Sequence, residues 1–217
     1  TSEVLEGQFN GRELTVVSTF DDSVLDQADE TSAENGSADS GIPSSQYILD
    51  VFDDGFMSVT DEYQALYMEV PASWDQIDGT LWTEYWGDLY FEAASVVAAP
   101  DLESFYSSYG ASGVNFAASE DWGNIGGYIG LLDGTKHWFQ DSCTIVERED
   151  YEDPLYEGAY DIWDCGRDAQ VVVIGVRPIA DPTAYLALVQ VQITEESDYD
   201  ALERIIDTFD LLDGFLP

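Results

Sequence analysis

Hydrophobic positions are densest in the last quarter of the chain, between Ala169 and Phe215. Val171 to Val176 is apolar throughout, which is typical of an interior strand with both faces covered. Tyr185 to Ile193 is a second apolar run, and a proline-containing turn separates the two. Apolar residues then recur at the spacing of an amphipathic helix: Ala201, Leu202, Ile205, Ile206 and Phe209. We expect this strand–turn–strand–helix unit to form the centre of the core.

Shorter runs earlier in the chain predict more strands. Tyr47 to Phe52 and Phe56 to Thr60 flank Asp53-Asp54-Gly55, and the Asp-Gly pair favours the positive φ angles of a tight hairpin. Further strands are predicted at Gln64 to Val70, Gly87 to Ala98 and Gly113 to Ala118.

A helix is predicted directly after Asp101, whose side chain suits the N-cap position. Leu102, Phe105, Tyr106 and Tyr109 follow at helical spacing. We interpret this aromatic stripe as core rather than as a platform for a ligand. Asp121 to Leu132 is ambiguous, because its glycines disfavour a helix while its apolar residues keep helical spacing.

The first 45 residues differ in composition from the rest, and we predict an acidic arm at residues 1–45 followed by a single domain at 46–217. Within the arm, Gly11 to Phe20 has the alternation of a β-strand, and Asp21 to Ser45 has the composition of a linker. Asn35 begins an Asn-Gly-Ser sequon and is a candidate glycosylation site. The candidate assembly strand, which would add to a neighbouring subunit's sheet, carries Leu14, Val16, Val17 and Phe20.

These elements together predict an α+β fold. We expect an antiparallel β-sheet covered by helices, an α-β-α sandwich, with an extended acidic N-terminal arm. A chain of 217 residues is long enough to bury a sizeable core without a metal or a dense disulfide network.

The net charge of the chain limits the molecules that it can bind. The chain has 6 basic and 45 acidic residues, a net charge of −39. Nucleic acid and anionic lipid are bound mainly through Lys and Arg, so we expect neither as a partner. High salt, a calcium-rich exterior or an acidic medium would each tolerate such a surface, and the scarcity of lysine favours high salt. Surface-bound Ca²⁺ or other cations are the only cofactors that we expect, and no specific metal ligands stand out.

Cys143 and Cys165 are the only cysteines, and they flank a predicted hairpin. Its strands are Cys143 to Arg148 and Tyr156 to Cys165, joined by the acidic loop Glu149 to Leu155. Across antiparallel strands the cysteines would form a disulfide worth about 3 kcal/mol, although two buried free thiols are the alternative. The disulfide predicts a secreted protein, outside the cell or at its surface. No apolar run is long enough to span a membrane.

The residue types give little support to catalysis, and we assign no catalytic residue. The only histidine, His137, is predicted to lie in a turn, and no GxSxG elbow occurs. A glycosidase with two carboxylates stays open, because 45 acidic residues offer too many pairs to choose from. The acidic and aromatic residues of 82–86 and 161–164 could stack on a sugar, or they could be half-buried strand residues, which we favour.

As a whole, the pattern resembles PsbP/Mog1-type α-β-α domains between about Gln46 and Leu212. The segments that carry the resemblance are VPASW, APDLESFYSSYG, YEGAYDIWDC, VVVIGVRP, LALVQVQIT and ALERIIDTFD. Similar domains accompany secreted bacterial trypsin-like proteases as non-catalytic extensions. The resemblance implies an antiparallel sheet covered by helices and no active site.

Our main hypothesis is therefore a secreted, non-enzymatic structural or interaction domain. Its partner would be a second copy, through donation of the N-terminal strand, or another extracellular protein. Two alternatives stay open: a carboxylate-based extracellular glycan hydrolase, and an accessory binding domain for a secreted protease or a glycan.

The charge generates the first prediction. Because most carboxylates have no basic partner, raising NaCl from 0.1 M to 2 M should increase the midpoint of thermal unfolding by several degrees. The Debye length falls from about 10 Å at 0.1 M to about 3 Å at 1 M. A sucrose series, which stabilises proteins without screening charge, is the control. An unfolding midpoint that does not change with NaCl would contradict adaptation to salt.

Overall fold

The computed structural model describes residues 2–9, 12–19, 44–86, 89–166 and 169–212. The chain forms two compact units, Thr1–Pro43 and Ser44–Pro217. We describe each unit by itself.

The first unit contains an antiparallel hairpin of β1 (Ser2–Phe9) and β2 (Arg12–Thr19). The pairing runs from Ser2 opposite Thr19 to Phe9 opposite Arg12. The strand expected in Gly11 to Phe20 is thus β2, and β1 occupies one of its two edges.

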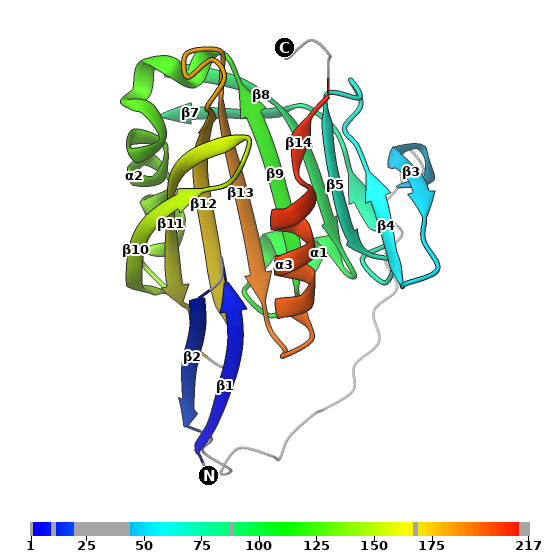
Figure 1. The fold of residues 1–217 in the computed structure, drawn as a ribbon, viewed down its shortest axis with the longest axis vertical. Coiled ribbons are helices and arrows are strands. Elements are labelled where there is room, and N and C mark those ends of the chain that lie inside the picture. Colours follow the sequence, from blue (N-terminus) through cyan, green and yellow to red (C-terminus); the bar gives the residue numbers. More distant parts are fainter. Residues whose placement is uncertain (1, 10–11, 20–43, 87–88, 167–168, 213–217) are drawn as a thin grey trace, which may run out of the picture. The chain divides into compact units, whose positions relative to one another are not determined.

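The second unit contains strands, three α-helices and two short 3-10 helices (Figure 1). In chain order they are η1 (Ser44–Tyr47), β3 (Ile48–Val51), β4 (Phe56–Val59), β5 (Leu66–Pro71), β6 (Gln76–Asp78), β7 (Trp82–Trp86), β8 (Leu89–Ala99), α1 (Leu102–Ser107), β9 (Gly113–Ser119), η2 (Asp121–Ile125), α2 (Gly127–Phe139), β10 (Thr144–Glu152), β11 (Tyr156–Asp164), β12 (Gln170–Pro178), β13 (Leu186–Ile193), α3 (Asp198–Thr208) and β14 (Asp210–Leu211).

Eight of these strands form one antiparallel sheet in the order β10-β11-β12-β13-β9-β8-β6, with β7 also paired to β8. The predicted hairpin at the cysteines is β10–β11, and its strands are longer than expected, so that only residues 153–155 connect them. The two strands predicted in the last quarter, β12 and β13, lie inside this sheet, as their apolar sequences require.

The opposite faces of the large sheet are covered differently. One face packs on α3 and on a second sheet of four strands, in the order β14-β5-β4-β3. On this face the ring of Phe116 contacts Phe209, at the end of α3, with 5.6 Å between ring centroids. Figure 1 shows α3 lying across β13 with β14 and β5 beside it.

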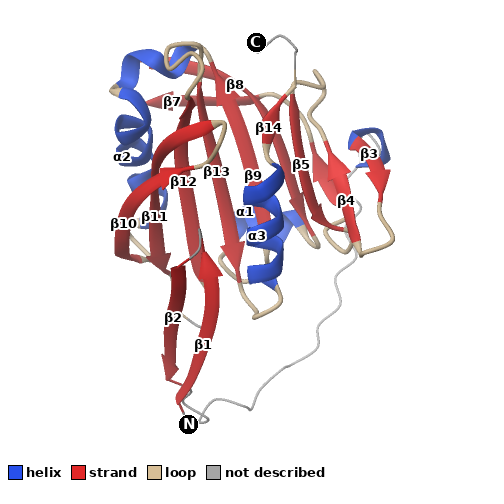
Figure 2. Ribbon diagram, viewed as in Figure 1, coloured by secondary structure: helices blue, strands red, loops and turns tan. Residues whose placement is uncertain are grey.

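The expected α-β-α sandwich is therefore wrong. Most of the described elements are antiparallel strands in two sheets, and the three α-helices have only 6, 13 and 11 residues (Figure 2). The strands predicted within residues 47–70 are present as β3, β4 and β5, but they belong to a second sheet, which covers one face of the large sheet where a helical layer was expected. In β5 buried and half-buried residues alternate along the strand, which is the pattern of a strand that packs on a core with one face.

The other face of the large sheet is covered by α2, which resolves the ambiguous glycine-rich segment. Gly126 has φ 98° and connects η2 to α2, in a conformation that favours glycine. A Cβ on Gly175 of β12 would lie 3.0 Å from Leu132 and 3.1 Å from the carbonyl oxygen of Tyr128. Gly126 thus allows the chain to turn between η2 and α2, and Gly175 allows α2 to lie close against β12.

A buried carboxylate joins β10 to β11. Asp161 has no exposed side-chain surface and accepts hydrogen bonds from Nε and Nη2 of Arg148, at 2.5 and 2.7 Å. Arg148 also pairs with the exposed Asp133 of α2, at 2.9 Å. Arg148 therefore ties the edge of the sheet to the helix.

Arg148→Met should lower the free energy of unfolding by about 3 kcal/mol, because it leaves the charge of Asp161 buried without its partner. Arg177→Met is the matched control, since Arg177 pairs with Glu157 where both side chains are about 40% exposed (38% and 41%). The control should lose less than about 1 kcal/mol. Urea unfolding measures both variants, and equal losses would contradict the structural role of the Arg148–Asp161 pair.

Candidate functional site

A cleft with a volume of about 720 Å³ lies on the face of the large sheet that carries α2. Its floor is a strip of sheet between α1 and the end of α2. Residues at matching register positions on three neighbouring strands form this strip: Ser95 and Val97 of β8, Asn115 of β9, and Gln190 and Gln192 of β13. Directly beside it, the same face carries the apolar core residues Ala117 and Leu188. The floor is therefore a place where an apolar sheet face becomes polar.

Aromatic side chains form the walls of the cleft. Phe105, Tyr106 and Tyr109 come from α1 and the turn after it, Trp138 comes from α2, and Trp82 comes from β7. Trp82 lies edge-on to Trp138, with centroids 5.5 Å apart, and to the buried Trp122, at 5.6 Å. Ring contacts thus hold the half-buried Trp82 and Trp138 in place, and both residues line the cleft.

The aromatic stripe after Asp101 only partly belongs to the core. Phe105 is buried against Val97 and Ala99, as expected. Tyr106 is 59% exposed, and α1 ends at Ser107, before Tyr109. Because the helix is a short one, these two tyrosines line the cleft.

Local hydrogen bonds fix the position of α1. Asp101 caps the helix by accepting hydrogen bonds from the backbone N–H and the hydroxyl of Ser104, at 3.0 and 3.1 Å. These bonds lower the pKa of Asp101. At the other end of α1, the amide of Gln192 is 1% exposed and donates to the carbonyl oxygens of Ser108 and Ala111, at 3.1 and 2.5 Å.

Two amide side chains on the floor keep hydrogen-bonding capacity. Ser95 donates to the side-chain oxygen of Asn115 at 3.3 Å, which leaves the Asn115 amide nitrogen without an acceptor in the described part of the chain. The half-buried Gln190 makes no side-chain hydrogen bond to any described residue. These groups can donate to and accept from a molecule that enters the cleft.

The cleft carries little charge for so acidic a protein. Asp78 is the one ionisable carboxylate among the described residues that line it, and no Lys, Arg or His lines it. Asp78 already accepts hydrogen bonds from the backbone and the hydroxyl of Thr80, at 3.0 and 2.7 Å, and from the hydroxyl of Tyr106, at 3.3 Å. Partial burial raises the pKa of Tyr109. The pKa of Tyr106 is also raised, because the hydroxyl end of this otherwise exposed side chain is partly shielded from water and lies beside the carboxylate of Asp78.

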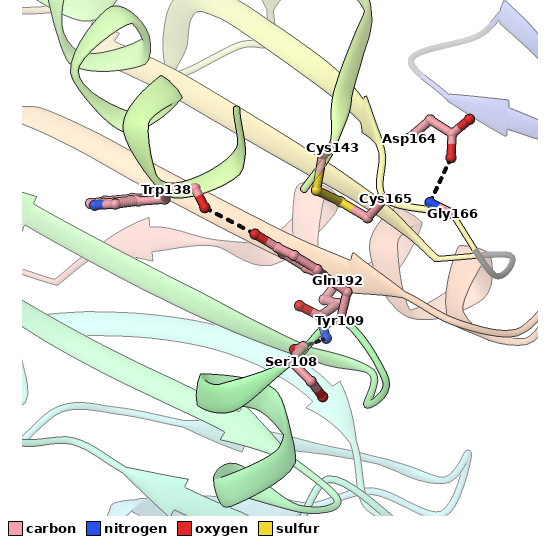
Figure 3. The surroundings of a disulfide bond; sticks show 8 residues. All are labelled: Ser108, Tyr109, Trp138, Cys143, Asp164, Cys165, Gly166 and Gln192. Atoms are coloured by element: carbon pink, nitrogen blue, oxygen red, sulfur yellow. Dashed lines mark hydrogen bonds between the residues drawn. A yellow bond between two sulfur atoms is a disulfide. The ribbon is translucent and has the colours of Figure 1, made fainter. Parts of the chain in front are cut away.

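The predicted disulfide is present between Cys143 and Cys165, with an S–S distance of 2.08 Å (Figure 3). It joins the turn after α2 to the end of β11. The backbone N–H of Cys143 donates to the carbonyl oxygen of Phe139 at 2.7 Å, and the hydroxyl of Tyr109 donates to that of Trp138 at 3.0 Å. The disulfide and the Tyr109 bond thus hold the α2 wall of the cleft from two sides.

The other candidate residues lie elsewhere. Leu14, Val16 and Val17 are in β2, whereas Phe20 and Asn35 fall outside the described residues. His137 lies in α2, not in a turn, and does not line the cleft. Asp161 and Trp163 are buried strand residues, 0% and 3% exposed.

Metal binding and membrane insertion find no support in the described ranges. No group of three or more His, Cys, Asp or Glu residues there could hold a metal ion. None of the helices there is long and apolar enough to cross a bilayer.

Sequence reasoning missed the cleft, because its residues come from segments between 78 and 192 that are far apart along the chain. A weak signal was present in β13, where Gln190 and Gln192 interrupt an otherwise apolar run.

Comparison with known proteins adds no relative. No protein-family model matches the chain, and no curated protein matches its sequence. The resemblance to PsbP/Mog1-type domains stays a prediction.

Proposed function

We propose that the second unit is a secreted, non-enzymatic interaction domain that binds a ligand in the cleft. The disulfide supports the location, since such bonds persist in oxidising compartments. The cleft supports the binding role, because it combines aromatic walls with a few polar groups, as ligand sites commonly do.

The observation that carries this proposal is the pair of amides on the floor. Asn115 and Gln190 are half-buried in adjacent strands, directly opposite each other in the pairing. Polar groups in such a position normally have hydrogen-bond partners. Within the described residues neither amide nitrogen has one, so a ligand or water would supply it.

The residues that line the cleft favour binding over hydrolysis. Glycosidases commonly use two carboxyl groups, about 5 Å apart or about 6.5–9.5 Å apart according to mechanism. Among the described residues that line the cleft, only Asp78 carries a carboxylate, and it is already hydrogen bonded. The hydrolase alternative therefore draws no support from this cleft.

To test the proposal, we would measure thermal unfolding with a panel of neutral oligosaccharides, uronic-acid oligosaccharides and short peptides. A ligand present at 100 times its Kd stabilises the folded state by about 2.7 kcal/mol, which should raise the unfolding midpoint by several degrees. The shift should disappear in the double variant Asn115→Ala/Gln190→Ala.

The matched control is Gln46→Ala/Gln140→Ala, which removes two exposed amides outside the cleft. It should keep the full shift. Mass spectrometry should recover the ligand unchanged. A shift that survives loss of the cleft amides, or a ligand that is cleaved, would contradict a non-enzymatic binding cleft.

Self-assembly through the first unit is a second candidate function, favoured by the small size of its sheet. β1 and β2 form a two-stranded sheet of their own. An isolated hairpin is marginally stable in water at best, so packing against another surface would stabilise it. Because β1 already pairs with β2, the donated element would be the whole hairpin rather than a single strand.

Deleting residues 1–20 should convert a self-assembling protein to a monomer, with the mass measured by light scattering. Leu14→Asp is the milder variant, because it adds one charge within β2 and keeps the full length of the chain. An unchanged mass in the deletion variant would rule out assembly through the hairpin.

A further inference from the structure

The cleft identifies a chemical class of ligand, and this inference rests on the proposed binding function. The polar row on its floor has regular geometry. Val97 is opposite Asn115, which in turn is opposite Gln190, and adjacent strands lie about 4.8 Å apart. Asn115 and Gln190 are thus neighbours on adjacent strands, and Ser95, opposite Ala117, lies diagonally from Asn115 and donates to it at 3.3 Å. Such a row can both donate and accept hydrogen bonds along an extended polar edge.

The walls offer a different surface from the floor. Trp82 and Trp138 are half-buried, and Tyr106 is 59% exposed on α1. Large flat rings give extensive apolar contact with little loss of conformational freedom. A pyranose ring matches this combination, because it has apolar C–H faces and a rim of hydroxyls.

The charge of the cleft argues against an anionic ligand. Anionic ligands are usually held by Arg or Lys, and neither type occurs among the described residues that line the cleft. The net charge of −39 also repels an anion as it approaches. For a cation, the described lining residues offer one carboxylate, that of Asp78, which already accepts three hydrogen bonds.

The backbone beside the cleft argues against an extended peptide. Peptides commonly add a strand to an open sheet edge through backbone hydrogen bonds. Between β6 and β7, the N–H of Thr80 already donates to Asp78 at 3.0 Å, and that of Leu81 donates to Glu62 at 3.1 Å. This segment has these donors occupied and is poorly suited to pair with a peptide.

We infer that the cleft binds an uncharged oligosaccharide, with sugar rings against Trp82, Trp138 and Tyr106 and hydroxyls hydrogen bonded to Asn115 and Gln190. A volume of about 720 Å³ lies within the usual range for small-molecule sites, roughly 300–1,000 Å³, so the ligand is a short glycan or the end of a longer one.

Calorimetric titration tests this class directly, with neutral gluco-, manno-, xylo- and chito-oligosaccharides, an oligogalacturonate, and uncharged and basic peptides as probes. At least one neutral oligosaccharide should bind. Its Kd should change less than about twofold between 0.1 and 1 M NaCl, because an uncharged ligand makes no ion pair with the cleft that salt could screen.

Single variants assign the contacts. Gln190→Ala and Tyr106→Ala should each weaken the binding of that oligosaccharide about tenfold, the effect of losing one good hydrogen bond or ring contact. Tyr63→Ala is the control for Tyr106, because Tyr63 is also exposed, at 48%, and does not line the cleft. It should bind like the wild type.

The outcomes separate this inference from the proposed function. Binding of the oligogalacturonate or a peptide that depends on Gln190, without binding of any neutral oligosaccharide, would overturn the ligand class and leave the binding cleft standing. If no probe binds in a way that depends on Gln190 or Tyr106, both the class and the cleft function fail.

Discussion

The large sheet has to hide two faces from water, and the lengths of the elements that cover it decide where it remains open. On one face the second sheet and α3 share the task, joined by contacts such as Phe116 with Phe209. On the other face α2 has 13 residues and α1 has 6. Two helices of this length leave a strip of β8, β9 and β13 open between them. The change from Leu188 to Gln190 and Gln192 along β13 occurs at this strip, so the polar residues of β13 lie where the helices leave the sheet uncovered.

Local signals predicted the local elements well. The apolar runs gave β12 and β13, the helical spacing after Ser197 gave α3, and Asp101 is the N-cap that its residue type suggested. The cysteines form the disulfide expected from their places at the ends of a hairpin. In each of these cases residues within one element or one hairpin determine the outcome.

Non-local pairing explains what the sequence did not reveal. The second sheet pairs Leu66 of β5 with Leu211 of β14, near opposite ends of the second unit, and no periodicity encodes such a partner. The strands within residues 48–71 were predicted, but not that they form a second sheet, which can cover an apolar sheet face as well as a helical layer can. The cleft also depends on non-local pairing, since Asp78 and Gln192 are far apart along the chain and line the same cleft only in the folded sheet. For the ambiguous segment, Gly126 and Gly127 adopt positive φ angles where α2 begins, and a Cβ on Gly130 would clash with the carbonyl oxygen of Ile125, so local backbone geometry accounts for these glycines.

The position of Cys143 connects the site to the conditions under which the protein is made. Its bond to Cys165 fastens the turn that follows Trp138 and Phe139, so oxidation completes one wall of the cleft. Chains synthesised in a reducing cytosol would carry the same residues with that wall unfastened. The disulfide thus links the structure of this wall to an oxidising compartment, in which such bonds form and persist.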